Sequence, residues 1–186
     1  MLIQNGLVFT QDEQFLPLTI RTDGEWITTV SESIPVPAEE KSESVIDASG
    51  CYVIPGLTDI HFHGCDGYDF CDNSLEAYEK IASFCLRHGV TSICPATMTL
   101  QMEILNDICK TAAVFHSLQA EKNNFQNCAE LIGIHMEGPF ISQAKKGAQN
   151  AAYICPPDDD SIERFLSLSK GLVKLISLAP ELPNAL

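Results

Sequence analysis

Apolar and polar residues alternate with a period of two along much of the first part of the chain, which is the pattern of β-strands with one buried face. Residues 18–22 and 26–30 show it most clearly, and an Asp23-Gly24 pair lies between them. Asp-Gly between two alternating segments is typical of a tight hairpin turn. These residues therefore predict an antiparallel β-hairpin.

The rest of this region also indicates strands and loops. Residues 2–10 predict a strand, with Asn5-Gly6 as a turn signal inside it. Residues 31–44 are rich in Ser, Pro and Glu and lack periodicity, so we expect a loop there, followed by a short strand at 45–47. Together these elements predict a small β-sandwich-like domain over residues 1–51.

From residue 52 onward, short apolar segments alternate with longer segments whose apolar residues recur every three or four positions. The first helix is expected to begin at Asn73, with Glu76 completing a capping box, and to end at Gly89. Further helices are expected over residues 101–116 and from Asp158 onward. The four expected strands cover residues 57–63, 91–97, 130–137 and 173–179.

Strands that alternate with helices predict an α/β fold with a parallel sheet. A closed (β/α)8 TIM-type barrel has eight strands and typically about 250 residues, so about four βα units amount to part of a barrel. We therefore expect residues 52–186 to form the first half of a barrel. A doubly wound open sheet is the alternative, but no glycine-rich phosphate loop follows the first strand.

Composition narrows the function classes. The formal net charge is −14, from 25 acidic and 11 basic side chains, which disfavours nucleic acid and anionic membrane surfaces as partners. No leader-like start and no apolar run of about 18 residues is present, so we expect a cytoplasmic protein. The eight cysteines include no CxxC pair and are interpreted mainly as small buried side chains.

The segment Pro55 to Gly64 carries the first candidate chemistry. In a strand, alternation would place Asp59, His61 and His63 on one face. At the carboxyl end of a barrel strand, two such imidazoles can bind one divalent ion together. The alternative is a pair of interior histidines that only make hydrogen bonds.

The second candidate is Glu137, which ends an expected strand just before the break at Gly138-Pro139. A carboxylate in a barrel mouth needs a cation or strong donors to offset its desolvation. We interpret Glu137 as a metal ligand and His135, one layer deeper on the same face, as a residue that supports the site. The alternative for Glu137 is a surface glutamate that caps local amides.

These motifs resemble those of the N-acetylglucosamine-6-phosphate deacetylases, a family of the amidohydrolase superfamily. The resemblance spans the whole chain. The His61 and His63 motif indicates only an amidohydrolase, whereas His-Met-Glu-Gly-Pro-Phe at 135–140, followed by Lys-Lys-Gly-Ala at 145–148, is narrower. It points to the amino-sugar deacetylases.

The resemblance implies roles for matching residues. Glu137 is similar to the glutamate that ligates the catalytic metal, and His61 and His63 to a pair that holds another metal. Ala148 is similar to a residue whose backbone contacts the sugar, and Gln149 stands where the family often has His. The implied cofactor is zinc or iron, as one or two ions, and the implied substrate is a phosphorylated amino sugar.

The implied reaction is hydrolysis of the N-acetyl group of N-acetylglucosamine 6-phosphate to glucosamine 6-phosphate and acetate. The resemblance places the catalytic base and further metal ligands beyond Leu186, so we expect this chain alone to be inactive. Exposed strand edges of a half barrel predict a homo-oligomer. Two alternatives remain open: another amidohydrolase that acts on cyclic amides, and a non-catalytic assembly module.

Overall fold

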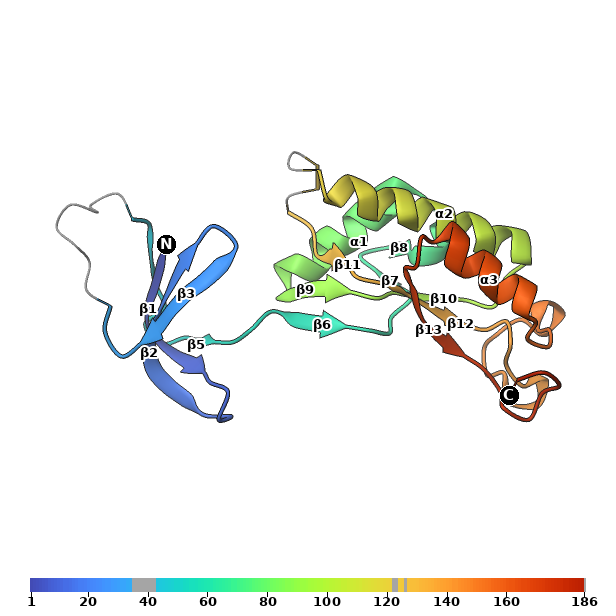
Figure 1. The fold of residues 1–186 in the computed structure, drawn as a ribbon, viewed down its shortest axis with the longest axis horizontal. Helices are drawn as coiled ribbons and strands as arrows, with labels where there is room; N and C mark the ends of the chain where they lie inside the picture. Colours follow the sequence, from blue (N-terminus) through green and yellow to red (C-terminus); the bar gives the residue numbers. More distant parts are fainter. Residues whose placement is uncertain (35–42, 122–123, 126, 186) are drawn as a thin grey trace. The chain divides into compact units, whose positions relative to one another are not determined.

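The computed structural model describes residues 1–34, 43–121, 124–125 and 127–185, and it divides the chain into two compact units (Figure 1). The first unit is Met1–Pro55 and the second is Gly56–Leu186. Strands make up the regular structure described in the first unit, and the second unit combines parallel strands with helices. The predicted mixed α/β class is therefore confirmed.

The first unit is a sheet built around its first strand. That strand pairs antiparallel with the second strand and parallel with two short later strands, and a hairpin adds a further strand at the edge. Apart from β5, which pairs with β1, the order is β3-β2-β1-β4. The strands are β1 (Leu2–Phe9), β2 (Phe15–Asp23), β3 (Trp26–Ser31), β4 (Val45–Asp47) and β5 (Tyr52–Val53).

Two turn signals of this unit have different outcomes. The hairpin is confirmed, with Gly24 at a φ of 55° in the turn between β2 and β3. The turn expected at Asn5-Gly6 is wrong, because β1 continues through it with a register shift between Ile3 and Gly6. Asn5 takes a φ of 66°, so this pair forms a bulge in the strand rather than its end. Residues 35–42 of the predicted loop lie outside the described residues.

The second unit has parallel strands that lie beside their neighbours in chain order. One three-stranded group has the order β11-β9-β6 and the other β10-β12-β13, and the hydrogen bond from His135 N to Pro95 O joins them. The strands are β6 (Leu57–Asp59), β9 (Val90–Ile93), β10 (Ala96–Thr97), β11 (Glu130–Leu131), β12 (Ile134–Glu137) and β13 (Val173–Ser177).

The predicted strands are longer than those observed. The strand expected at 91–97 is interrupted at Pro95, which has no N–H to donate to a ladder. The strand expected at 130–137 is interrupted at Gly133, where a Cβ would lie 2.6 Å from the Lys174 side chain. The strand expected at 57–63 ends at Asp59, because the Asp59 carboxylate accepts the N–H of His61 at 3.0 Å.

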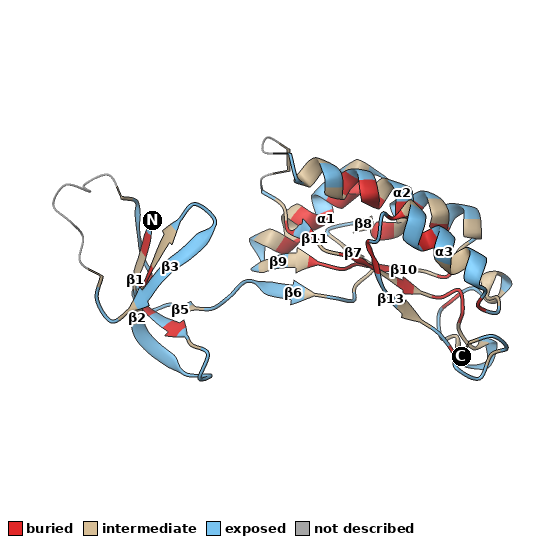
Figure 2. Cartoon of the chain, in the orientation of Figure 1, coloured by how far each residue is buried: buried red, intermediate tan, exposed pale blue. Residues whose placement is uncertain are grey.

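Three helices cover one side of these strands (Figure 1). They are α1 (Leu75–Arg87), α2 (Met102–Gln119) and α3 (Asp159–Leu168), and Figure 2 shows buried residues along them. Their apolar faces pack with the strands in one hydrophobic core, which includes the fully buried Phe115, Phe140 and Phe165. The strand ends are thus held against a well-packed layer.

The start of α1 differs from its prediction by one residue. Ser74, rather than Asn73, is the N-cap, and its hydroxyl accepts the N–H of Ala77 at 3.1 Å. Asn73 has a left-handed conformation and ends a preceding short 3-10 helix (Phe70–Asp72), so it cannot also cap α1. The expected stop is close to the observed one, with Gly89 at a φ of 84° just after the helix.

Candidate metal centre

His61, His63 and Glu137 come together where β6 and β12 end. One ligand atom from each residue lies within 4.8 Å of the others. Glu137 is the last residue of β12, while both histidines follow the end of β6 in an irregular segment. Because β6 and β12 run in the same direction within parallel ladders, their carboxyl ends lie at the same edge.

In the contact between His63 and Glu137, the two facing atoms can both act as hydrogen-bond acceptors. Nδ1 of His63 lies 3.2 Å from the Ala96 carbonyl oxygen, to which it can only donate, so Nε2 of the neutral ring carries a lone pair. That Nε2 lies 3.0 Å from Oε2 of Glu137. This carboxylate oxygen is shielded from solvent and has no hydrogen bond of suitable geometry among the described residues. Two electron-rich atoms therefore face each other, which is stable only with a cation or a proton between them.

His61 contacts a different residue, His135. Its Nδ1 lies 3.1 Å from Nδ1 of His135, and the two rings meet edge to face. Nε2 of His135 in turn lies 2.9 Å from the hydroxyl of Ser177 on β13. Burial lowers the pKa of His135, so its ring is held in the neutral form. His135 thus contacts both His61 and Ser177, and so links His61 to β13.

The backbone of Glu137 contacts Thr99 in addition to its pairing with β13. The Thr99 hydroxyl donates to the Glu137 carbonyl oxygen at 3.1 Å. Gly138 follows with a φ of 98°, and a Cβ there would lie 2.1 Å from the Thr99 hydroxyl oxygen. Glycine is therefore required at this position on two grounds, the left-handed conformation and the close approach.

The two predicted sugar contacts lie in the loop after Glu137. Ala148 is exposed, whereas Gln149 is buried. Oε1 of Gln149 accepts the backbone N–H of Thr99 at 2.7 Å, so its side chain is engaged by the protein itself. Contact of these residues with a substrate stays a prediction.

Sequence reasoning did not single out Thr99 or Ser177. Each lies at or just after the carboxyl end of a parallel strand, Thr99 after β10 and Ser177 at the end of β13. The sequence did carry a signal for these two residues, namely a polar side chain at the carboxyl end of an expected parallel strand. Such strand ends meet at the edge of the sheet where sites form.

Cys65 and Cys71 lie in the segment that follows the histidines. Burial raises the pKa of both thiols, that of Cys71 to about 12, and Cys71 Sγ accepts the N–H of Met98 at 3.2 Å. Both sulfurs are therefore protonated at neutral pH, and Cys71 is engaged by the protein itself.

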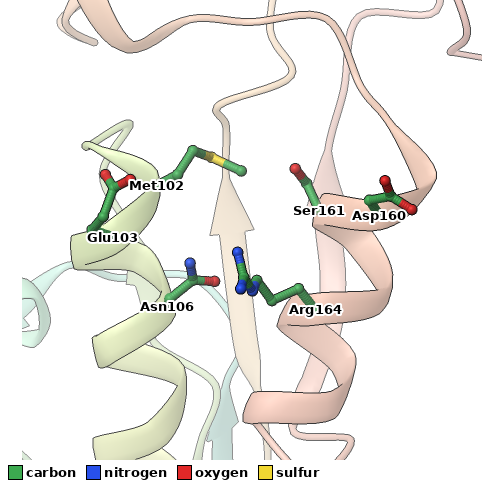
Figure 3. Close-up of a pocket in the computed structure, with 6 residues that line it drawn as sticks. All are labelled: Met102, Glu103, Asn106, Asp160, Ser161 and Arg164. Atoms are coloured by element: carbon green, nitrogen blue, oxygen red, sulfur yellow. The ribbon is translucent and has the colours of Figure 1, made fainter.

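A separate groove of about 380 Å³ lies between α2 and α3 (Figure 3). Its walls carry charges of both signs, and no residue of the histidine–glutamate cluster contributes to it. The lining residues are Met102, Glu103, Asn106, Asp160, Ser161 and Arg164. Among the helices of the described ranges, none has the length and apolar character needed to cross a membrane.

Comparison with known proteins first defines a class. No protein-family profile matches the chain. The characterised proteins that resemble it are deacetylases, which are hydrolytic enzymes. The chain therefore resembles hydrolytic enzymes.

More narrowly, its relatives in sequence and in structure are N-acetylglucosamine-6-phosphate deacetylases, which confirms the predicted family resemblance. The enzyme of Bacillus subtilis is 30% identical over 97% of this chain and 44% of its own length. That of Lysinibacillus sphaericus is 33% identical over 76% of this chain and 35% of its own length.

A solved mutant deacetylase from Mycobacterium smegmatis, in complex with N-acetyl-D-glucosamine-6-phosphate, has a TM-score of 0.81 and 25% identity. The match covers all of this chain and 45% of that one. The chain thus spans less than half the length of these relatives.

Proposed function

We propose that this chain forms part of an N-acetylglucosamine-6-phosphate deacetylase, which hydrolyses the N-acetyl group to give glucosamine 6-phosphate and acetate. The relationship to deacetylases supports this assignment, and the solved relative with the phosphorylated sugar supports the substrate. The observation that carries the proposal is the meeting of Glu137 with His61 and His63 at the strand ends.

We assign these three residues as ligands of a divalent ion. The donor set fits such an ion, because Oε2 of Glu137, which makes no hydrogen bond among the described residues, lies 3.0 Å from Nε2 of His63. Imidazole and carboxylate together suit zinc or iron, as one or two ions. When bound, such an ion supplies Lewis-acid chemistry that polarises an acyl oxygen and acidifies water.

The protein groups around the cluster then hold its geometry. The Ala96 carbonyl orients the His63 ring, and the neutral His135 orients His61. We further propose that the backbone of Ala148 and the residue Gln149 lie beside the bound sugar. Because the chain spans less than half the length of its relatives, we predict that this chain alone is inactive.

We propose that Met1–Pro55, four residues longer than the predicted 1–51, forms part of a small β domain and that Gly56–Leu186, rather than 52–186, is the first half of a (β/α)8 barrel. Parallel strands that neighbour one another in chain order, with helices on one side, support the barrel over a doubly wound sheet, which carries helices on both faces.

We also propose that copies of the chain associate. β6 and β13 each pair on one side only within the described strands, and Leu57 and Leu175 on them are exposed. Unpaired apolar edges favour pairing with another chain. Light scattering on the purified chain should show a dimer or larger species, and a compact monomer would contradict this proposal.

The function is tested with the protein that contains this chain. Acetate release from N-acetylglucosamine 6-phosphate should be lost after chelator treatment, return with zinc or iron, and be lost in His63→Ala. Hydrolysis of a cyclic amide such as dihydroorotate, with no acetate release, would replace the proposed substrate. A protein that hydrolyses neither compound and binds no metal would be a non-catalytic module.

A further inference from the structure

The side chain of Gln149 is 5% exposed, although Ala148 and Asn150 beside it are exposed. Its Oε1 accepts the backbone N–H of Thr99 at 2.7 Å, and its Nε2 lies 3.8 Å from the sulfur of Met98. The amide orientation is therefore fixed, because the opposite one would place NH2 against the Thr99 N–H. Gln149 ties its own loop to the segment that follows β10.

Thr99 continues this connection to Glu137. Thr99 is 1% exposed, and its hydroxyl donates to the Glu137 carbonyl oxygen at 3.1 Å. Its hydroxyl oxygen also lies so close to Gly138 that no Cβ fits there. Thr99 therefore joins the Gln149 side chain, through its N–H, to the Glu137 backbone, through its hydroxyl.

We propose that Gln149 is a positioning residue for the metal centre. Through Thr99 it fixes the backbone of Glu137, and thereby the direction in which the carboxylate meets His63. This role rests on the proposed function of the cluster. It is distinct from contact with a sugar, because the Gln149 acceptor oxygen is already bonded to Thr99.

Two substitutions separate the hydrogen bond from packing. Gln149→Met keeps length and volume but removes the acceptor, which leaves the buried Thr99 N–H without a partner. Gln149→His restores an acceptor nitrogen. Gln119 provides a matched control, because its Oε1 accepts the Leu131 N–H at 3.0 Å and its Nε2 donates to the Ala129 carbonyl at 2.8 Å. Gln119 lies at the end of α2, and Gln119→Met loses the same kind of bond there.

The measurement is the Zn²⁺ affinity of the 186-residue chain, by competition with a chromophoric chelator, together with the thermal unfolding midpoint without zinc. Gln149→Met should weaken Zn²⁺ binding about 10-fold or more, as is usual for residues that support metal ligands. Gln149→His should recover most of the affinity. Gln119→Met should lower the unfolding midpoint and leave the affinity unchanged.

Equal affinity of Gln149→Met and the wild type would overturn this role and leave the metal site intact. An equal loss in Gln119→Met would also overturn it, since the effect would then come from general destabilisation. Absence of Zn²⁺ binding in the wild type would instead overturn the proposed metal site.

If Gln149→Met does not fold, Thr99→Ser and Thr99→Val make the same test. The serine variant keeps the hydroxyl that donates to Glu137 and should bind Zn²⁺ as the wild type does, whereas the valine variant should bind more weakly by a similar factor. Equal affinities of these two variants would overturn the proposal.

Discussion

The two units bury their apolar residues in different ways. Among the described residues of the first unit, the buried apolar side chains are few, namely Leu2, Val8, Ile20 and Ala48. Large apolar residues of the same sheet are exposed, Trp26 by 78% and Tyr52 by 68%. The second unit places three helices against its strands, and its core cluster is much larger. A sheet without a covering layer cannot bury both faces, whereas a sheet under helices buries one completely.

This difference explains where a precise site can form. The candidate ligands lie on strand ends of the second unit, whose buried residues leave little freedom for the backbone. The contrast predicts that equivalent substitutions have large effects in the second unit and small effects in the first.

The largest effect is expected for Phe115→Ala. Phe115 is fully buried and packs edge to face on Tyr78 at a centroid distance of 5.8 Å. The cavity and lost burial should cost about 3–5 kcal/mol in the free energy of unfolding. Trp26→Ala should change it by less than about 0.5 kcal/mol, because this ring is mostly exposed. Urea unfolding followed by circular dichroism measures both, and a comparable cost for the two variants would remove the contrast.

The next effect concerns two glycines with positive φ. Gly138→Ala should cost about 3 kcal/mol or more, because the strained backbone conformation is combined with a clash against Thr99. Gly24→Ala, at a φ of 55° with open space around it, should cost only about 1 kcal/mol. Unfolding free energies of both variants decide the point, and similar values would mean that Thr99 can move away from Gly138.

The smallest effect is expected for Tyr78→Phe. The Tyr78 hydroxyl is buried and has no hydrogen-bond partner among the described residues, and burial raises its pKa. Removing it should leave stability unchanged or raise it by up to about 1 kcal/mol. Tyr52→Phe in the exposed sheet is the control, with an expected change near zero. A clear loss of stability in Tyr78→Phe would show that the hydroxyl has a partner, such as an ordered water.

The helices could be predicted well from the sequence because their signals are local. Residues 101–116 were expected and α2 covers Met102–Gln119, and α3 starts after Asp158 as its acidic first turn indicated. The strand lengths could not be predicted equally well. Pro95 was a local signal for one interruption, whereas the other falls at Gly133, where a Cβ would lie 2.6 Å from Lys174, which is distant in sequence.

The candidate site, too, could be predicted only in part. Alternation along strands suggested that His61, His63 and Glu137 would meet, and the structure brings them together. The path to this arrangement was not predictable, because β6 ends at Asp59 and an irregular segment places the histidines. The polar residues Thr99 and Ser177 at strand ends were visible in the sequence, but their partners were not, because these contacts join separate strands.

We propose above that His61, His63 and Glu137 share one divalent-ion site. A crystal structure of the zinc-loaded chain, with anomalous diffraction measured at the zinc edge, tests it directly. We expect a zinc peak at about 2.0–2.2 Å from Nε2 of His63 and from a carboxylate oxygen of Glu137. A zinc peak elsewhere in the chain, with His63 and Glu137 still in direct contact, would contradict it.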